Sequence, residues 1–156
     1  MKILRATLEH LDEVAGLFDR YRQFYEQAAN PDGCRAFIEA RMKNLESIIF
    51  AAQAADGRLV GFTQLYHSFC SVDMTELVYL YDLYVVPEAR RQGVAEALMT
   101  AARDHAARRG AGRLQLETAI SNRPGQALYE KLGWELDSDF LTYHLSLQDK
   151  NGDSDE

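Results

Sequence analysis

The sequence predicts an α/β domain built on a mixed β-sheet with helices on both faces. The chain has 156 residues, 47% of them hydrophobic and 26% charged, which suits one globular domain with a full core. Apolar residues alternate with a period of two in some segments and recur at helical spacing in others. Strands come first and then alternate with helices, an order typical of a mixed sheet. We expect one domain over residues 1–148 and a disordered acidic tail over residues 149–156.

The first half of the chain is expected to hold a strand, two helices and a hairpin. Thr7 is suited to cap the first helix, because its hydroxyl can accept a hydrogen bond from a backbone N–H of the first turn. Asp56-Gly57 is a strong hairpin signal between two β-like runs. The expected elements are a strand at Ile3–Ala6, helices at Glu9–Arg20 and Cys34–Asn44, a substrate-side loop at Tyr21–Gly33, and strands at Ser47–Ala54 and Leu59–Phe69.

The second half is expected to begin with a central strand at Val78–Val86, because both of its faces are mostly apolar. Strict alternation places Leu80, Asp82 and Tyr84 on the same face. Pro87 should end this strand. The remaining expected elements are helices at Val94–Arg109 and Pro124–Leu132 and strands at Leu114–Ala119 and Phe140–Leu147.

A short turn with the sequence RRQGVA, Arg90–Ala95, follows the central strand and opens the next helix. Backbone N–H groups at a helix N-terminus lack intrahelical partners, and the helix dipole adds positive potential there. Gly93 has no Cβ, so a ligand can approach the backbone, and Arg90 and Arg91 add charge. No GK[ST] follows and G-x-G-x-x-G is absent, which argues against nucleotide hydrolysis and hydride transfer. The turn is therefore predicted to bind phosphate groups of another kind of ligand.

This turn resembles the phosphate loop of the GNAT superfamily of N-acetyltransferases, Q/R-x-x-G-x-G/A, which Arg90, Gly93 and Ala95 match. A second block, LQLETAISNRPGQALYEKLGW, is similar to the family's later strand and helix. The nearest subgroup is the bacterial branch that resembles histone and D-amino-acid acetyltransferases, judged by DLYVVPEARRQGVA and LETAISN. The resemblance implies a mostly antiparallel sheet of about six to seven strands.

The resemblance also implies the reaction. Acetyl-coenzyme A (acetyl-CoA) would be the donor, and a primary amine of a small molecule or peptide would attack the thioester directly, with no covalent enzyme intermediate and no metal. The backbone of Leu83 and Val85 would bind the pantetheine arm as an added strand does. The expected cofactor-binding residues are Leu83, Tyr84, Val85, Arg90, Arg91, Gln92, Gly93, Val94, Ala95 and Asn122.

Two residues of the second block each have two interpretations. Asn122 matches a family position that reaches the cofactor arm, but Asn is also a common helix N-cap. Tyr129 would be the catalytic residue that protonates the departing thiolate, since a phenol of pKa about 10 can donate a proton at neutral pH. The alternative for Tyr129 is a ring that packs in the core with a hydrogen-bonded hydroxyl.

The chain departs from the family at two places. Some members carry a carboxylate early in the central strand, where this chain has Val78 and Tyr79, so the general base stays open. Gly125 stands where many relatives have Ala, which puts the position of Asn122 in doubt. The candidates for the base are Glu26, His67, Glu76, Asp82 and Glu117.

Composition limits the partners. The net charge of −7 argues against nonspecific nucleic-acid binding and is compatible with a cationic amine. Cys34 and Cys70 form no ligand or redox motif. No apolar run reaches the roughly 18 residues of a membrane span, and no signal peptide is evident, which predicts a cytoplasmic protein without a membrane partner.

Two other functions are compatible with parts of the sequence. A non-catalytic acyl-CoA binding or sensing module would keep the phosphate turn but would not need Tyr129, and a structural domain would not need the arginine-flanked turn. The acceptor stays open among small amines, amino acids, polyamines, aminoglycosides and protein amines, because acceptor loops vary within a fold. A homodimer formed through the final strands is a further expectation.

Overall fold

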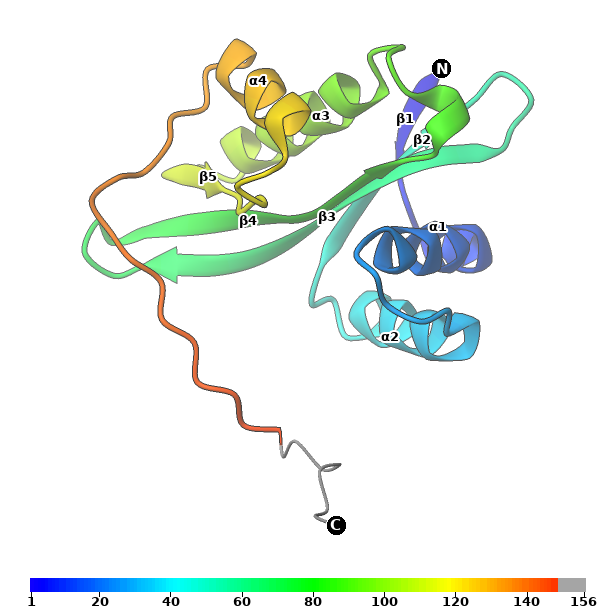
Figure 1. The fold of residues 1–156 in the computed structure, drawn as a ribbon, viewed down its shortest axis with the longest axis horizontal. Helices are drawn as coiled ribbons and strands as arrows, with labels where there is room; N and C mark the ends of the chain where they lie inside the picture. The colour runs from blue at the N-terminus through cyan, green and yellow to red at the C-terminus, as the bar shows by residue number, and fades with distance from the viewer. Residues whose placement is uncertain (149–156) are drawn as a thin grey trace. The chain divides into compact units, whose positions relative to one another are not determined.

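A computed structural model describes residues 1–148, and the predicted acidic tail, residues 149–156, lies outside the described residues. Contacts along the chain divide it into two units, Met1–Ser121 and the residues from Asn122 onward. The first unit contains the sheet with helices on both faces, and the second contains one helix (Figure 1). The expectation of one domain over residues 1–148 stays a prediction.

The first unit is built on one five-stranded sheet in the order β1-β2-β3-β4-β5. All neighbouring strands are antiparallel except β4 and β5, which are parallel. The strands are β1 at Lys2–Arg5, β2 at Ile48–Gln53, β3 at Leu59–Cys70, β4 at Thr75–Val85 and β5 at Arg113–Gln115. The predicted mixed, mostly antiparallel fold is therefore confirmed, with five strands in the described residues rather than six to seven.

Helices cover both faces of this sheet. The helical elements are η1 at Leu8–His10, α1 at Leu11–Phe24, α2 at Pro31–Lys43, η2 at Pro87–Ala89, α3 at Val94–Arg108 and, in the second unit, α4 at Arg123–Lys131. On one face, Phe18 of α1 meets Phe62 of β3, with ring centroids 6.4 Å apart. On the other face, His105 of α3 lies 5.8 Å from Phe50 of β2. No helix within residues 1–148 combines the length and apolarity needed to cross a membrane.

The predicted apolar stripe of α3 forms the core on its face. Its side chains lie at helical spacing, and all are less than 9% exposed. They are Val94, Leu98, Met99, Ala102 and Ala106, joined by His105, which sequence periodicity did not single out. The opposite face is closed by residues such as Val14 of α1 and Ile38 of α2, both 0% exposed.

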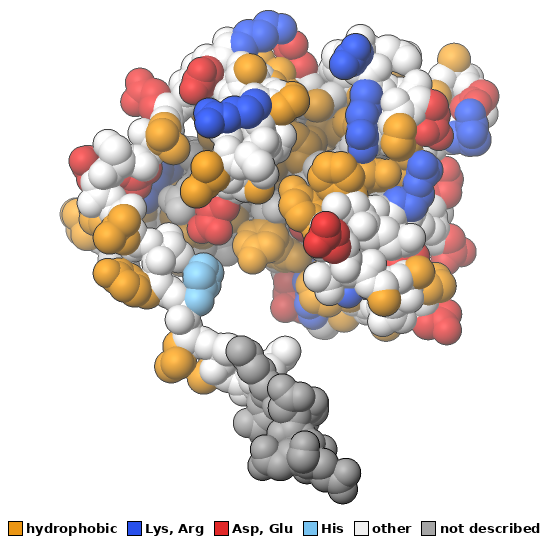
Figure 2. Space-filling view, viewed as in Figure 1, with side chains coloured by type: hydrophobic (Ala, Val, Ile, Leu, Met, Phe, Trp, Pro, Cys, Tyr) orange, Lys and Arg blue, Asp and Glu red, His pale blue; other side chains and the backbone are white. Residues whose placement is uncertain are grey.

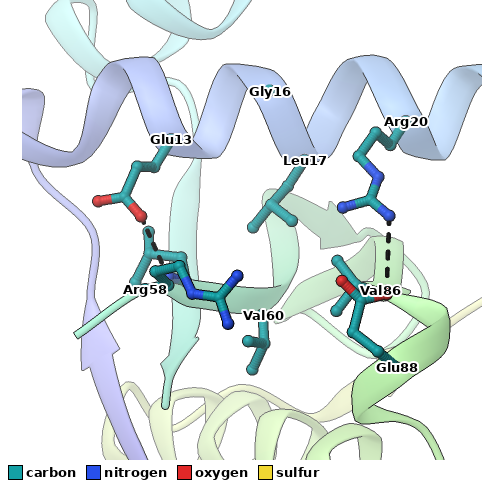
Figure 3. A pocket seen from close by; sticks show the side chains of 9 residues that line it. Glu13, Gly16, Leu17, Arg20, Arg58, Val60, Val86 and Glu88 are labelled. Atoms are coloured by element: carbon teal, nitrogen blue, oxygen red, sulfur yellow. Dashed lines mark hydrogen bonds and ion pairs between the residues drawn. The ribbon is translucent and has the colours of Figure 1, made fainter. Parts of the chain in front are cut away.

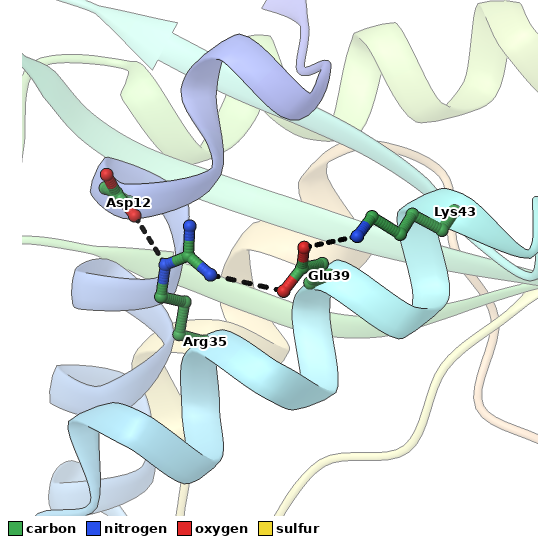
Figure 4. Close-up of polar contacts among 4 residues, drawn as sticks. All are labelled: Asp12, Arg35, Glu39 and Lys43. Atoms are coloured by element: carbon green, nitrogen blue, oxygen red, sulfur yellow. Dashed lines mark hydrogen bonds and ion pairs between the residues drawn. The ribbon is translucent and has the colours of Figure 1, made fainter.

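Helices α1 and α2 are also linked by surface charges (Figure 4). Arg35 of α2 donates from Nε to Asp12 of α1 at 2.8 Å and pairs with Glu39 at 3.1 Å. Lys43 completes the chain by pairing with Glu39 at 2.6 Å. Such exposed pairs are worth about 0–1 kcal/mol each, so the packed aromatic and aliphatic side chains fix this layer.

The predicted helix boundaries and loop of the first half need correction. Helix α1 continues to Phe24 and α2 begins at Pro31, so the expected substrate-side loop is shortened to residues 25–30. Helix α2 begins earlier than predicted because Asn30, its N-cap, accepts a hydrogen bond from Gly33 N. The Thr7 cap is confirmed, although it serves η1, where its hydroxyl accepts from Glu9 N.

The expected last strand at Phe140–Leu147 is wrong, because residues 140–147 have no regular secondary structure. The expected strand at Leu114–Ala119 is reduced to β5. Alternating apolar residues identify a segment suited to a sheet, but a strand also needs a neighbour for its backbone groups. Within the described residues no strand pairs with 140–147.

A bulge in β4 overturns the expected alternation along the central strand. Leu65 of β3 faces Leu80, whereas the preceding residue, Gln64, faces Asp82, which leaves Tyr81 as an extra residue. Because Gln64 and Leu65 point to opposite faces, Leu80 and Asp82 do so as well. Asp82 therefore lies on the face covered by α1 and α2.

Candidate active site

The predicted phosphate loop lies between η2 and α3 and has an unusual backbone. Gly93 is the N-cap of α3 with φ +77°, and Arg91 has φ +59°. A non-glycine residue in the left-handed region costs roughly 1–2 kcal/mol and is enriched at functional sites. The loop also leaves open space where a Gly93 Cβ would stand.

This backbone presents N–H groups outward. The first α-helical hydrogen bond of α3 runs from Ala97 N to Gly93 O, so the N–H groups of Val94 and Ala95 precede it. No side chain of the N-cap residue occupies them. The arrangement suits an anion, because these donors and the helix dipole act in the same direction.

Arg90 has a structural role that its sequence position did not suggest. Its Nε donates to Val85 O at 2.9 Å, which ties the loop to the end of β4. Its guanidinium also lies over the rings of Phe24 and Tyr84, 5.6 and 5.8 Å from their centroids. The side chain is therefore held in place before any ligand arrives, which lowers the entropic cost of using its remaining N–H groups.

The edge of β4 next to this loop lacks a partner strand. Strand β5 pairs with β4 only at Leu77–Tyr79, and no other strand of the described residues adds to that edge. Val86 N donates to Val60 O, and hydrogen-bonded residues alternate along an antiparallel ladder. Leu83 and Val85 must therefore direct their N–H and C=O groups toward the open edge.

The predicted cofactor-binding residues of the first unit thus lie together, at the end of β4 and the start of α3. Tyr84 differs from its neighbours, because its backbone faces β3 and its ring is 7% exposed beneath Arg90. Gln92 braces the loop by donating to Glu88 O at 3.2 Å. Sequence reasoning missed the ring contacts of Phe24 and Tyr84 with Arg90, which join segments far apart in the chain.

Asn122 and Tyr129 belong to the second unit. Asn122 is the N-cap of α4, and its side chain accepts a hydrogen bond from Gly125 N at 3.2 Å. A Cβ on Gly125 would stand 2.4 Å from the Asn122 amide nitrogen, so glycine at this position permits the cap. The ring of Tyr129 lies 6.4 Å from that of Trp134. The capping role of Asn122 is confirmed, and its role toward the cofactor stays a prediction.

Two of the candidate bases are occupied by other partners. Glu76 accepts from Arg109 Nε at 2.7 Å, and this hydrogen bond lowers the pKa of the carboxyl. His67 Nε2 lies 2.9 Å from His105 Nε2 on the α3 face, and burial lowers the pKa of His67. Glu26 and Glu117 are exposed.

Asp82 differs from the other candidates because it is a buried carboxyl, 5% exposed, in a polar network. Gln64 donates to Asp82 Oδ2 at 2.8 Å and accepts from Ser47 Oγ at 2.9 Å. The hydroxyl of Tyr21 of α1 interacts electrostatically with the carboxylate. Burial raises the pKa of Asp82, and the interactions with Gln64 and Tyr21 oppose this rise. Sequence alone gave no sign of Tyr21, because the contact depends on how α1 packs.

A separate pocket of about 280 Å³ lies between α1 and the segments that lead into the loop (Figure 3). Its floor is apolar, and its rim carries Arg20 paired with Glu88 at 3.8 Å. Glu13 on the same rim accepts from Leu59 N at 3.1 Å. The charged groups on the rim are thus engaged by one another and by the backbone.

No cluster of three or more His, Cys, Asp or Glu side chains in residues 1–148 forms a candidate metal site.

A helix N-terminus with free N–H groups beside an open strand edge suits a ligand that carries phosphates at one end and amides along its length. The acetyltransferase (GNAT) family matches residues 14–134, and the chain belongs to this family. It is accordingly an acetyl-CoA-dependent N-acetyltransferase.

Individual relatives agree with this membership. The chain is 43% identical over 150 residues to a Bacillus subtilis (strain 168) protein described as the uncharacterized N-acetyltransferase YhfO, covering 96% of this chain and all of the relative. A crystal structure of a probable acetyltransferase is 42% identical, covers 96% of this chain and all of its own, and has a TM-score of 0.90. The D-amino-acid N-acetyltransferase HPA3 of Saccharomyces cerevisiae (strain ATCC 204508 / S288c) is 27% identical, with 87% of each chain covered.

Proposed function

We propose that the chain transfers the acetyl group of acetyl-CoA to a primary amine of a small molecule or peptide by direct attack of the amine on the thioester. The observation that carries this proposal is the continuity of the phosphate loop with the open edge of β4. A ligand with a pyrophosphate at one end and amides along its length fits both features at once.

The loop would hold the pyrophosphate of the cofactor. The N–H groups of Val94 and Ala95 would donate to phosphate oxygens, with Arg91 and Arg90 supplying charge from the loop. Arg90 retains guanidinium donors beyond the Nε that binds Val85 O.

The open edge would hold the pantetheine arm. Amides of the arm can pair with the backbone groups of Leu83 and with Val85 N, since Val85 O is already taken by Arg90. The thioester would then lie near the β4 bulge, where a backbone N–H can polarise its carbonyl. Asn122 is proposed to contact the arm in addition to capping α4.

Chemistry would proceed by attack of the neutral amine on the carbonyl carbon. The C–N bond forms, the C–S bond breaks, and the thiolate of CoA leaves. Tyr129 is proposed to donate a proton to that thiolate and to regain one from the product nitrogen. No nucleophile of the protein takes part, so the reaction should show no acetyl-enzyme intermediate.

Two matched glycine variants test the cofactor site. Gly93→Ala and Gly57→Ala both place a Cβ at a positive φ, +77° and +89°, with open space around it. Each should therefore destabilise the fold by a similar amount, about 1 kcal/mol. Only Gly93→Ala should weaken CoA binding in calorimetry, by at least tenfold. Equal CoA affinity in the two variants would overturn the proposed loop function, as would absence of CoA binding by the folded wild-type protein.

We further propose that two copies of the chain associate through residues 140–147. Leu141, Tyr143, Leu145 and Leu147 alternate with polar residues, and each is at least 82% exposed. Figure 2 shows hydrophobic side chains along the segment that precedes the grey residues. Such a segment acquires backbone partners and covers its apolar face when it joins a sheet of another molecule.

Light scattering after size exclusion measures this association. The wild type should elute as a dimer, and Leu145→Asp should yield monomer. Val72→Asp is the matched control, because Val72 is 92% exposed at the β3–β4 turn and should leave the dimer intact. A monomeric wild-type protein would refute the association.

A further inference from the structure

The bulge in β4 is surrounded by buried polar side chains that the reaction as proposed does not use. Of the four polar or charged residues that are buried within residues 1–148, three lie at this bulge and the fourth is His105. The three are Thr63 and Gln64, both 0% exposed, and Asp82, which is 5% exposed. Burying a polar group costs free energy unless its hydrogen bonds are satisfied, so three such groups at one irregularity of the sheet indicate a requirement at that position.

The bulge changes which residues of β4 face the open edge. Val86 N, at the end of the strand, donates across to β3, whereas Glu76 O, near its start, accepts from Gly112 N just before β5. These two residues of β4 are separated by an even number of positions, so in a regular strand their backbone groups would point the same way. The extra residue Tyr81 reverses the direction between them. Strand β4 can therefore pair with β5 near its start and still turn the backbone of Leu83 toward the open edge.

Two hydrogen bonds hold the residue that follows the bulge. Gln64 Nε2 donates to Asp82 Oδ2 at 2.8 Å, and Thr63 Oγ1 donates to the backbone oxygen of Asp82, also at 2.8 Å. Consecutive residues of a strand point to opposite faces, so Asp82 is held from both faces of the sheet. Ser47 Oγ donates to Gln64 Oε1 at 2.9 Å, which turns the amide nitrogen of Gln64 toward Asp82.

We propose that Asp82 is a positioning residue, whose bonds to Gln64 and Thr63 fix the bulge at Tyr81 and thereby aim the backbone of Leu83 at the pantetheine arm. This inference rests on the proposed function, and it gives Asp82 a task other than that of a general base. If the bulge moved along β4 toward the phosphate loop, Asp82 would no longer lie opposite Gln64, and Leu83 would lose its regular place at the open edge.

The network acts on the arm and not on the phosphate loop. The loop has braces of its own, because Arg90 Nε donates to Val85 O at 2.9 Å and Gln92 donates to Glu88 O at 3.2 Å. Hydrogen bonds weaken steeply when donor and acceptor are misaligned. Loss of the network should therefore weaken contacts along the open edge while the loop still binds a pyrophosphate.

The binding test compares two ligands by calorimetry. Acetyl-CoA has both a pyrophosphate and a pantetheine arm, whereas ADP has the pyrophosphate alone. Gln64→Leu keeps the bulk of the side chain but removes the donor to Asp82, and it should weaken acetyl-CoA binding about tenfold or more and ADP binding less than about threefold. Ile38→Val, at a buried position of α2, controls for a general loss of stability and should change neither affinity. Equal effects of Gln64→Leu on the two ligands would overturn the inference.

A matched pair at Thr63 tests the second bond with little change of shape. Thr63→Val removes the hydroxyl, and Thr63→Ser keeps it. Only Thr63→Val should weaken acetyl-CoA binding relative to ADP binding. The same loss in Thr63→Ser would show that the shape of this side chain matters and not its bond to Asp82, which would contradict the inference.

A pair at Asp82 separates positioning from acid–base chemistry. Asp82→Leu removes the acceptor, whereas the carbonyl oxygen of an asparagine can still accept from Gln64. Asp82→Leu should therefore weaken acetyl-CoA binding, and Asp82→Asn should restore most of the lost affinity and of kcat/KM. Equal losses of kcat in both variants, with acetyl-CoA affinity intact, would assign Asp82 to proton transfer and overturn its positioning role.

The bulge itself can be observed without a ligand. In nitrogen-15 NMR spectra, the amide signals of Tyr81 and Leu83 should each be single in the wild type and should broaden or double in Gln64→Leu. Single signals at unchanged positions in that variant would show that the bulge does not need the network. If the folded wild type bound neither ADP nor acetyl-CoA, the proposed function would fail, and this inference with it.

Discussion

The stability of the fold should fall as the pH is lowered toward 5, because of a histidine pair beneath α3. His67 Nε2 and His105 Nε2 lie 2.9 Å apart, so one ring donates its N–H and the other accepts. Protonation of the accepting ring would place two N–H groups against each other. Burial, reinforced by His67, Arg109, Arg5 and Arg108, lowers the pKa of His105 from 6.5 to about 4.

The sign and size follow from proton linkage. Between pH 6.5 and 4 the unfolded chain binds a proton at this position and the folded chain does not, so stability rises with pH over that window. Each pKa unit is worth about 1.4 kcal/mol, so the full effect has a ceiling of about 3 kcal/mol. His105 is only 8% exposed, which limits solvent screening, and lowering the pH from 7.5 to 5 should cost about 2 kcal/mol.

Urea unfolding followed by circular dichroism at pH 7.5 and 5 measures this difference. His105→Gln cannot take up a proton there, so this variant should lose much less stability than the wild type between the two pH values. His144→Gln, at an exposed position of the C-terminal segment, is the control and should behave as the wild type does. If His105→Gln and wild type lose the same free energy, the reasoning about the pair is wrong.

Three further predictions concern the active site. Tyr129→Phe should lower kcat about 100-fold while changing CoA affinity less than threefold in calorimetry, and unchanged turnover in a chemistry-limited assay would exclude the acid role. Asn122→Ala and Asn30→Ala remove equivalent caps, and each should cost about 1 kcal/mol in urea unfolding, but only Asn122→Ala should also weaken CoA binding. Arg90→Ala should weaken CoA binding at least tenfold relative to Arg103→Ala, which removes an exposed arginine paired with Asp104; equal affinities would contradict the role of Arg90.

Local patterns predicted most of the first unit. The order of strands and helices, the hairpin at Asp56-Gly57, and the turn that opens α3 are encoded in short stretches of sequence. The position of the turn at Gly93 was predictable for the same reason, because a glycine and a helix start are read from consecutive residues. Gly125 could be explained only from the structure, where its missing Cβ leaves room for the Asn122 side chain.

Features that depend on contacts between distant segments were not predictable. The alternation of the central strand gave no sign of the extra residue at Tyr81, because a bulge is defined by the partner strand. The burial of Asp82, one candidate base among five, and its interaction with Tyr21 depend on the packing of α1. The segment at residues 140–147 has a strand's pattern without a strand's pairing, which no local pattern reveals.

The contacts of Arg90 with Val85 O and with two aromatic rings explain why lysine would be a poor substitute, although lysine preserves the charge. A lysine ammonium is a compact point charge and cannot lie flat over two aromatic rings while a separate nitrogen bonds to Val85 O. Shape, and not electrostatics alone, therefore restricts this position to arginine. Exchange of Arg90 for lysine would therefore keep the positive charge and still loosen the loop from β4 and from Phe24 at the end of α1.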